Sequence, residues 1–219
     1  MANKRRTVAI IGLGVFGSVL SRELTRMGDR VIGLDRDEKR VSDLADEIDS
    51  VMQVDASDLK ALKEVGLEAC DSVVVAIGED MQASLLAAMN VQEIGCEGLW
   101  VKTQSPAHRK VLEALGVGNI VQPEQEFGLR IAQVIHNPRV SDYLALGNGK
   151  YVAEIEVPRE MVGATTDRLK LAEYQLKCVG VFRSGELLQS GLDAAELAIG
   201  DRLLIFGRRS DLRRFADGY

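Results

Sequence analysis

Residues 7–35 read TVAIIGLGVFGSVLSRELTRMGDRVIGLD, and this stretch decides the fold of the chain. It opens with an apolar run at residues 8–11, followed by the glycine pattern of residues 12–17. Apolar residues at helical spacing then continue to Met27, and a second apolar run ends at Asp35. This order predicts a strand, a glycine-rich turn, a helix and a second strand that ends in an acid.

Each feature of this stretch has a physical use in a nucleotide site. Gly12 permits the tight turn, Gly14 lets a pyrophosphate approach the backbone, and Gly17 lets the helix pack closely on the sheet. Free N–H groups at the start of the helix attract phosphate, and Asp35 can accept hydrogen bonds from ribose hydroxyls. The alternative is a glycine turn without a ligand; the flanking strand, helix and acid favour the nucleotide.

The composition indicates a globular protein with ordinary apolar and charged content. The 219 residues allow one large domain or two small ones. A net charge of −6 argues against nucleic acid as the main partner. The longest apolar run, near Val73–Ile77, is about six residues, against the ~20 that cross a bilayer. A role at a membrane would therefore depend on another protein.

The three cysteines are widely spaced along the chain, at Cys70, Cys96 and Cys178. Their odd number and the absence of a CxxC pair favour buried apolar residues over a disulfide or metal framework. Such a chain fits a reducing cytoplasm best.

Beyond Asp35 the pattern of strand and helix repeats. We expect Asp37 to cap a helix, and further strands at residues 50–54, 72–78, 99–102 and 119–121, with helices between them. Strands that alternate with helices predict an α/β fold, a Rossmann-like doubly wound parallel sheet. The strand ends should then meet at one crevice, and these ends are Gly12, Asp35, Asp55, Gly78 and Lys102.

The pattern changes after residue 124. Gln125–Ile135 predicts a helix that is apolar on more than one side, which fits either a second subunit or burial under the C-terminal segment. Tyr143–Lys150 is interpreted as a linker or turn. We therefore expect a nucleotide-binding domain at 1–124, a dimerisation helix and linker at 125–150, and a small α+β domain at 151–219.

Three charged or titratable residues in the first domain have two interpretations each. Lys102 at a strand end meets phosphate, or is a solvated lysine. His108 approaches a ligand from the rim of the crevice, or is exposed or capping. Glu124 holds a divalent cation beside phosphate, or is the first-turn acid of the next helix.

A dehydrogenase is the first enzyme class that a Rossmann pattern suggests, but the chain offers no obvious catalytic set. It has two histidines, and no tyrosine is followed by a lysine four residues later. The nucleotide is therefore expected to be sensed rather than consumed. An NAD-dependent oxidoreductase is the runner-up, and a free-standing nucleotide-binding protein is the third hypothesis.

The motifs together resemble the KtrA/TrkA family, the cytosolic regulatory subunits of bacterial potassium uptake systems, which are built from RCK domains. The resemblance is carried by GLGVFG at 12–17, LDRD at 34–37, VDAS at 54–57, VVAIGED at 74–80, LWVKTQ at 99–104 and PEQEFGLRIAQ at 123–133. The C-terminal stretch AIGDRLLIFGRRSDLRRF is similar to the second, ligand-binding domain of that family.

The resemblance implies that the first domain binds ATP or ADP, or NAD(H), with Asp35 on the ribose. It also implies that Glu124 helps to hold Mg²⁺ or Ca²⁺. The cofactor-binding residues that it suggests are Gly12, Gly14, Val15, Phe16, Gly17, Asp35, Arg36, Asp37, Asp55, Ala56, Ala76, Ile77, Gly78, Lys102, Thr103, His108 and Glu124.

The resemblance also implies an assembly. The helix from Gln125 would form a homodimer, and dimers would form an octameric ring at the inner face of the membrane, under a potassium-translocating subunit. Some family members bind cyclic di-AMP in the C-terminal domain. One departure is Val15, where KtrA-like proteins often carry an arginine that reaches a terminal phosphate. An apolar side chain cannot supply that charge, which leaves room for NAD(H).

Overall fold

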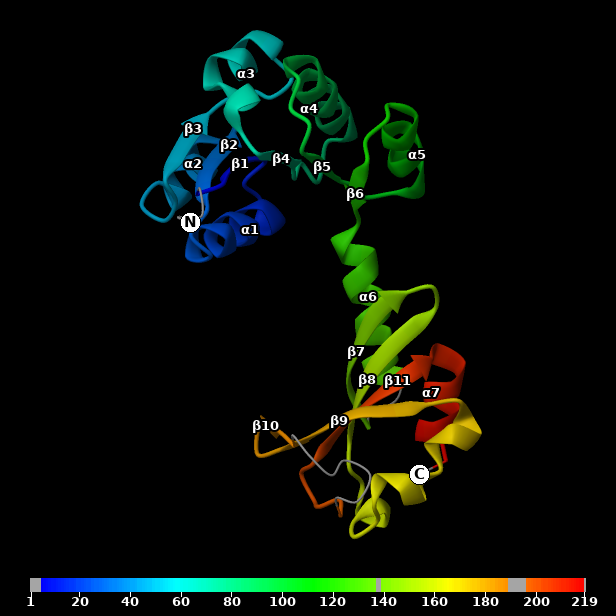
Figure 1. Ribbon diagram of the computed structural model, residues 1–219. Helices are drawn as coiled ribbons and strands as arrows, with labels where there is room; N and C mark the ends of the chain where they lie inside the picture. Colours follow the sequence, from blue (N-terminus) through cyan, green and yellow to red (C-terminus); the bar gives the residue numbers. More distant parts are fainter. Residues whose placement is uncertain (1–4, 137–138, 189–195, 219) are drawn as a thin grey trace. The chain divides into compact units, whose positions relative to one another are not determined.

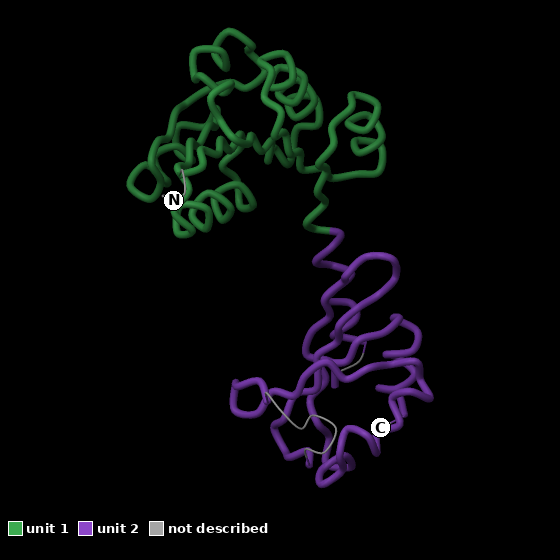
Figure 2. Tube along the Cα trace, in the orientation of Figure 1, with its two compact units in different colours: residues 1–124 green, residues 125–219 purple. Residues whose placement is uncertain are grey.

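The computed structural model describes residues 5–136, 139–188 and 196–218. The chain divides into two compact units, an N-terminal unit of residues 1–124 and a C-terminal unit of residues 125–219 (Figure 2). None of the helices in the described ranges combines the length and the apolar character that a membrane span requires.

The N-terminal unit is a six-stranded parallel sheet flanked by helices (Figure 1). Its strands lie in the order β3-β2-β1-β4-β5-β6, so the predicted doubly wound sheet is confirmed. The strands are β1 (Thr7–Ile11), β2 (Arg30–Asp35), β3 (Ser50–Gln53), β4 (Ser72–Val75), β5 (Leu99–Lys102) and β6 (Asn119–Val121). The helices are α1 (Val15–Arg26), α2 (Glu38–Leu44), α3 (Leu59–Val65), the 3₁₀ turn η1 (Leu67–Ala69), α4 (Met81–Ile94) and α5 (Pro106–Ala114).

The sheet is covered on both faces, and alternate residues of β1 serve the two layers. Ala9 and Ile11 lie in the core under α3, α4 and α5, whereas Val8 and Ile10 lie in the core under α1 and α2. This explains why the strands are apolar without alternation. Each fully buried aliphatic side chain contributes about 1.5–3 kcal/mol to these two cores.

Two of the three motif glycines are required by the fold. Gly12 has φ +97°, which favours glycine, and a Cβ on Gly17 would lie 1.9 Å from the carbonyl oxygen of Gly12. Gly14 is different, because the nearest atom to a Cβ there would be Arg40 Nη1 at 3.8 Å. Packing within the unit therefore explains Gly12 and Gly17 but not Gly14.

The C-terminal unit is a five-stranded sheet of order β10-β9-β11-β8-β7, whose described pairings are antiparallel. One face packs against α7 and the 3₁₀ turns through a core that contains Leu203, Ile205, Leu212 and Phe215. Its elements are α6 (Pro123–His136, which begins at the end of the N-terminal unit), β7 (Val140–Gly147), β8 (Lys150–Glu156), η2 (Arg159–Met161), η3 (Thr166–Leu169), η4 (Leu171–Tyr174), β9 (Lys177–Arg183), β10 (Glu186–Leu187), β11 (Arg202–Arg208) and α7 (Arg209–Ala216).

The interpretation of residues 143–150 as a linker is wrong for most of that segment. It forms the second half of β7, which pairs with β8, and only the predicted turn at 147–149 is present. Gly147, Asn148 and Gly149 all have positive φ there, which makes a tight hairpin connection. The glycines that suggested a break therefore reverse the chain within one sheet.

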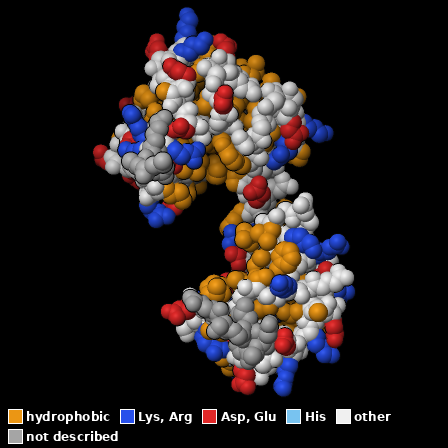
Figure 3. All heavy atoms as spheres, in the orientation of Figure 1, with side chains coloured by type: hydrophobic (Ala, Val, Ile, Leu, Met, Phe, Trp, Pro, Cys, Tyr) orange, Lys and Arg blue, Asp and Glu red, His pale blue; other side chains and the backbone are white. Residues whose placement is uncertain are grey.

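Helix α6 has no buried residue. Its large apolar side chains Phe127, Leu129, Ile131 and Ile135 are 59%, 54%, 38% and 74% exposed. The hypothesis that the C-terminal segment buries this helix is therefore wrong, and its apolar faces are left uncovered in the single chain. Hydrophobic side chains gather at the surface around α6 and β7 in Figure 3.

We expect Gly17→Ala to destabilise the N-terminal unit by about 3 kcal/mol, because the new methyl group forces α1 away from the turn. The sole tryptophan, Trp100, lies on β5, so its fluorescence during urea unfolding reports this unit. Gly14→Ala is the matched control, and should cost about 1 kcal/mol or less as a helix N-cap change. Equal losses in the two variants would contradict the close-packing argument.

Candidate functional site

The loops that carry the predicted site residues all leave the carboxyl edge of the parallel sheet. Residues 12–17 follow β1, Asp35 ends β2 and residues 36–37 follow it, and residues 76–78 follow β4. Lys102 ends β5 and Thr103 follows it, and Glu124 is the second residue of α6, just after β6. The strand order reverses between β1 and β4, and ligands of open α/β sheets bind at such a switch point.

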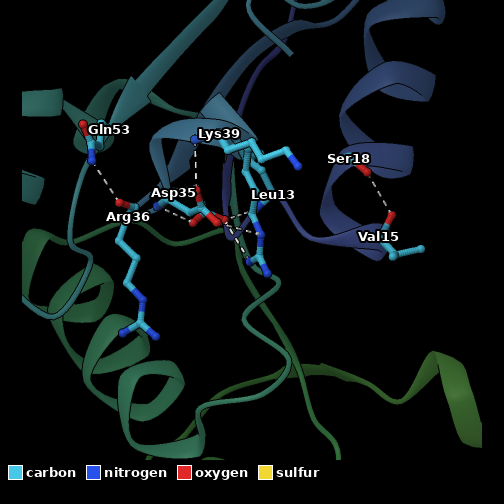
Figure 4. Close-up of polar contacts among 9 residues, drawn as sticks. Leu13, Val15, Ser18, Asp35, Arg36, Lys39 and Gln53 are labelled. Atoms are coloured by element: carbon cyan, nitrogen blue, oxygen red, sulfur yellow. Dashed lines mark hydrogen bonds and ion pairs between the residues drawn. The ribbon is translucent and has the colours of Figure 1, made fainter. Parts of the chain in front are cut away.

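The amino end of α1 is bare. Its N-cap is Gly14, no side chain caps it, and its first turn contains no acid. The N–H groups of a first helical turn have no partner within the helix, so this end attracts an anion. Val15 is 87% exposed, and its side chain points away from Asp35 (Figure 4).

Asp35 joins the glycine turn to the end of β2. It is 6% exposed, and its carboxylate accepts hydrogen bonds from the N–H of Leu13 at 2.7 Å and of Asp37 at 2.9 Å (Figure 4). Arg40 Nη1 lies 3.4 Å from Oδ2. A carboxylate has about four acceptor positions, so these three contacts leave capacity for a ribose hydroxyl.

The residues after β2 and β3 form the outer part of the site. Arg36 is exposed and its Nη1 lies 3.6 Å from Asp80 Oδ2, while its carbonyl oxygen accepts from Gln53 Nε2 (Figure 4). The hydroxyl and the amide of Ser57 donate to Asp55 at 2.7 and 2.9 Å. These hydrogen bonds, with the charge of Arg36, hold the pKa of Asp55 below its usual value. Asp55 is therefore engaged in its own turn.

Asp37 and Ala56 have local roles as well. Asp37 caps α2, as predicted, by accepting from the N–H of Lys39. Ala56 is buried, and its carbonyl oxygen accepts from Asn90 Nδ2 at 2.9 Å. Both contacts fix the loops that border the predicted adenosine position.

Lys102 brings together residues from four segments at the carboxyl edge of the sheet. The residue is 7% exposed, its Nζ lies 2.5 Å from Glu124 Oε1, and the ring centroid of Phe16 is 5.6 Å away. A Cβ on Gly78 would lie 3.5 Å from Nζ. The solvated interpretation of Lys102 is therefore wrong. Its hydrogen bond lowers the pKa of Glu124, which keeps that carboxylate ionised.

Thr103 and His108 are placed more deeply than the sequence suggests. Thr103 is fully buried, donates from its hydroxyl to the carbonyl of Ser105, and donates from its N–H to Val121. His108 is 2% exposed, on the same buried side of α5 as Leu112. The exposed interpretation of His108 is wrong. Burial lowers its pKa, and neither ring nitrogen has a hydrogen-bond partner within the described residues.

The protein alone does not assemble a metal centre in the part of the chain that the structure describes. There, no three side chains of His, Cys, Asp or Glu come together at one point. Glu124 would supply one carboxylate, and Mg²⁺ in proteins commonly binds through one or two carboxylates together with phosphate oxygens. A cation would therefore bind here only together with a phosphorylated ligand, whose phosphate oxygens would coordinate it as well.

These residues fit a nucleotide. Gly14 leaves open the space that a Cβ would fill, the uncapped end of α1 adjoins it, and Lys102 supplies a buried positive charge. Sequence reasoning missed Arg40, which lies beside both Gly14 and Asp35. No motif spacing singles out this residue, because only the return of α2 toward the turn places it there.

Comparison with known proteins identifies the family. The TrkA-N domain model matches residues 8–123. The chain is 34% identical over 212 residues to the Ktr system potassium uptake protein C of Bacillus subtilis, covering 96% of each. It is 30% identical over 213 residues to Ktr system potassium uptake protein A of the same organism, covering 97% of this chain and 96% of that one.

The fold also matches that of a solved ion channel. The GsuK channel superposes with a TM-score of 0.68 at 17% identity, over 97% of this chain and 39% of that one. The GsuK channel bound to NAD gives a TM-score of 0.63. The sequence matches, which span nearly the whole chain, show that this protein belongs to the KtrA/TrkA family of potassium uptake proteins, with a TrkA-N domain as its N-terminal unit.

Proposed function

We propose that this protein is a regulatory subunit of a potassium uptake system, which binds an adenine nucleotide at the carboxyl edge of its parallel sheet. The main support is that relatives matched over nearly their full length are Ktr potassium uptake proteins. The open turn at Gly14, the bare end of α1 and buried Lys102 supply the site.

The ligand is ATP or ADP, or NAD(H). The N–H groups of α1 and the charge of Lys102 would hold its phosphates, and Asp35 would accept from its ribose. The GsuK channel, which shares the fold, has been solved with NAD. Val15 provides no charge for a terminal phosphate, which weakens selection for ATP and suits a dinucleotide.

The nucleotide acts as a signal in this proposal. The matched relatives are named for potassium uptake and not for a reaction. A ligand shifts a conformational equilibrium only through different affinities for the two states, so nucleotides that bind the states unequally suffice to regulate. Hydride transfer, the alternative, gains no support from a particular side-chain arrangement in the described residues.

The proposed assembly is supported by the exposed apolar faces of α6. Its exposed apolar side chains, above all Phe127 and Ile135, favour burial against a second copy. We propose a homodimer through α6 and, from the family resemblance, an octameric ring at the cytoplasmic face of a membrane-embedded potassium-translocating subunit. Co-purification with that subunit tests the partnership.

Divalent cation binding is proposed at Glu124. The carboxylate is 65% exposed while its partner Lys102 is almost buried, so Glu124 is the partner that is free to move toward solvent. A phosphate that reaches Lys102 would compete with Glu124 for its charge, and the released carboxylate would then be available to a cation carried by the same phosphate.

Cyclic di-AMP is the proposed ligand of the C-terminal unit. Two cation–aromatic pairs lie on one face of its sheet, Lys150 over Phe206 at 5.5 Å and Arg202 over Phe182 at 5.9 Å. Arg202 and Phe206 are four residues apart on β11 and therefore lie on the same face of the sheet, and Arg202 is directly opposite Phe182 in β9. Cations suit phosphates and aromatic rings suit adenines, which supports this family property here.

Nucleotide binding is tested by a thermal-shift panel of ATP, ADP, NADH and cyclic di-AMP. A ligand at a hundred times its dissociation constant should stabilise by about 2.7 kcal/mol. Asp35→Ala should abolish the shift with the adenine nucleotides because the ribose loses its acceptor. Asp46→Ala, an exposed aspartate on the chain after α2, is the control with the same charge change. An intact shift in Asp35→Ala would show that the ribose lies elsewhere.

Glu124→Gln should separate the two roles of the carboxylate. Without metal, the variant should bind ADP about fivefold more tightly, because Lys102 no longer has an anionic competitor. With magnesium, the additional affinity of the wild type should be lost. Calorimetric titration in EDTA and in Mg²⁺ measures both effects, with Glu126→Gln, exposed on the same helix, as control. Weaker metal-free binding would contradict the competition at Lys102.

The dimer is tested by a charge on α6. Ile135→Asp should shift the sedimentation coefficient of the purified protein toward the monomer, because an ionised carboxylate is costly to bury in an apolar interface. Gln125→Asp, an exposed polar position on the same helix, should leave the assembly intact. Identical sedimentation of Ile135→Asp and the wild type would remove α6 from the interface.

A further inference from the structure

Arg40, on helix α2, places its guanidinium beside the glycine turn. Arg40 Nη1 lies 3.8 Å from the position of a Cβ on Gly14 and 3.4 Å from Asp35 Oδ2. Its Nε lies 3.8 Å from Asp37 Oδ2. The side chain is 45% exposed, so it borders solvent at the turn.

The turn has no cation in its own sequence. Position 15 is a valine, and the amino end of α1 offers backbone N–H groups only. The charge of Lys102 is already matched by Glu124 at 2.5 Å. Arg40 is therefore placed to provide positive charge where Gly14 leaves space for an anion.

The contact between Arg40 and Asp35 is easily exchanged. At 3.4 Å it is at the long end of hydrogen-bond distances, and Arg40 is partly solvated. Asp35 keeps the N–H groups of Leu13 and Asp37 as donors when the guanidinium leaves. A carboxylate that loses only its weakest donor remains oriented and gains an open acceptor position.

We propose that Arg40 is a second phosphate-binding cation of the nucleotide site, beside Lys102. In this exchange the guanidinium leaves Asp35 for a phosphate at the Gly14 turn, and Asp35 becomes open to the ribose hydroxyls. Arginine suits this role because its planar fork of donors matches phosphate oxygens. The inference rests on the proposed nucleotide binding and adds a specificity: the site selects phosphorylated ligands over the nucleoside.

A purely structural role makes a different prediction. If Arg40 only neutralised Asp35, its removal would disturb the ribose position and weaken adenosine and ADP alike. If Arg40 binds phosphate, removal weakens ADP while adenosine binds as before or more tightly, because Asp35 has lost a competitor. Comparison of the two ligands therefore separates the roles.

The experiment is calorimetric titration of the full-length protein with adenosine, ADP and NADH in the absence of metal. Arg40→Ala should weaken ADP and NADH by about tenfold to a hundredfold, with adenosine unchanged or tighter. Arg40→Lys should recover part of the loss by restoring the charge. Lys39→Ala, the exposed neighbour on α2, should match the wild type, which excludes an effect of net charge. Urea unfolding of each free variant checks that the unit is folded.

The outcomes distinguish this inference from the proposed function. A wild type that binds none of the three ligands overturns both. A wild type that binds ADP, with Arg40→Ala binding ADP equally well or losing adenosine and ADP by the same factor, overturns the role of Arg40 alone. Selective loss of the phosphorylated ligands, with partial recovery in Arg40→Lys, supports it.

Discussion

The close approach of α1 to the loop after β1 is the constraint on which the N-terminal unit depends. A Cβ on Gly17 would meet the carbonyl oxygen of Gly12 at 1.9 Å, so the helix starts almost in contact with the strand end. This approach directs the bare first turn of α1 at the switch point of the sheet. The same geometry that packs the helix therefore creates the anion-attracting end, and fold and site share one cause.

Much of the fold could be predicted because its signals are local. The apolar strands, the glycine turn and the capping residue Asp37 each act within a few residues of sequence. The hairpin at 147–149 was harder, because a glycine-rich segment looks the same whether it joins two domains or two strands. Only the pairing of β7 with β8 decides between them, and pairing is a long-range property.

In the candidate site too, some residues were predicted from local sequence and others depend on long-range contacts. Asp35 and Lys102 were predicted from their places at strand ends, but the burial of Lys102 follows from Phe16, Gly78 and Glu124, which come from three other segments of the chain. Arg40 was missed because its role depends on how α2 returns across the turn. His108 was wrongly predicted to be exposed, because helical spacing shows which residues of α5 share a face but does not show whether that face is buried.

The two cations of the site, Lys102 and Arg40, are each matched by a carboxylate of the chain, Glu124 and Asp35. On the proposed function, phosphate replaces both carboxylates as the anionic partner, so binding rearranges ion pairs instead of creating them. The net free energy of binding is then the small difference between the ion pairs that form with phosphate and the ion pairs that are lost. Such weak net binding suits reversible sensing more than tight retention. One released carboxylate, Glu124, belongs to the first turn of α6. On the proposed function, ligand binding would thereby change the contacts of α6, the one described helix that begins in the N-terminal unit and continues into the C-terminal unit.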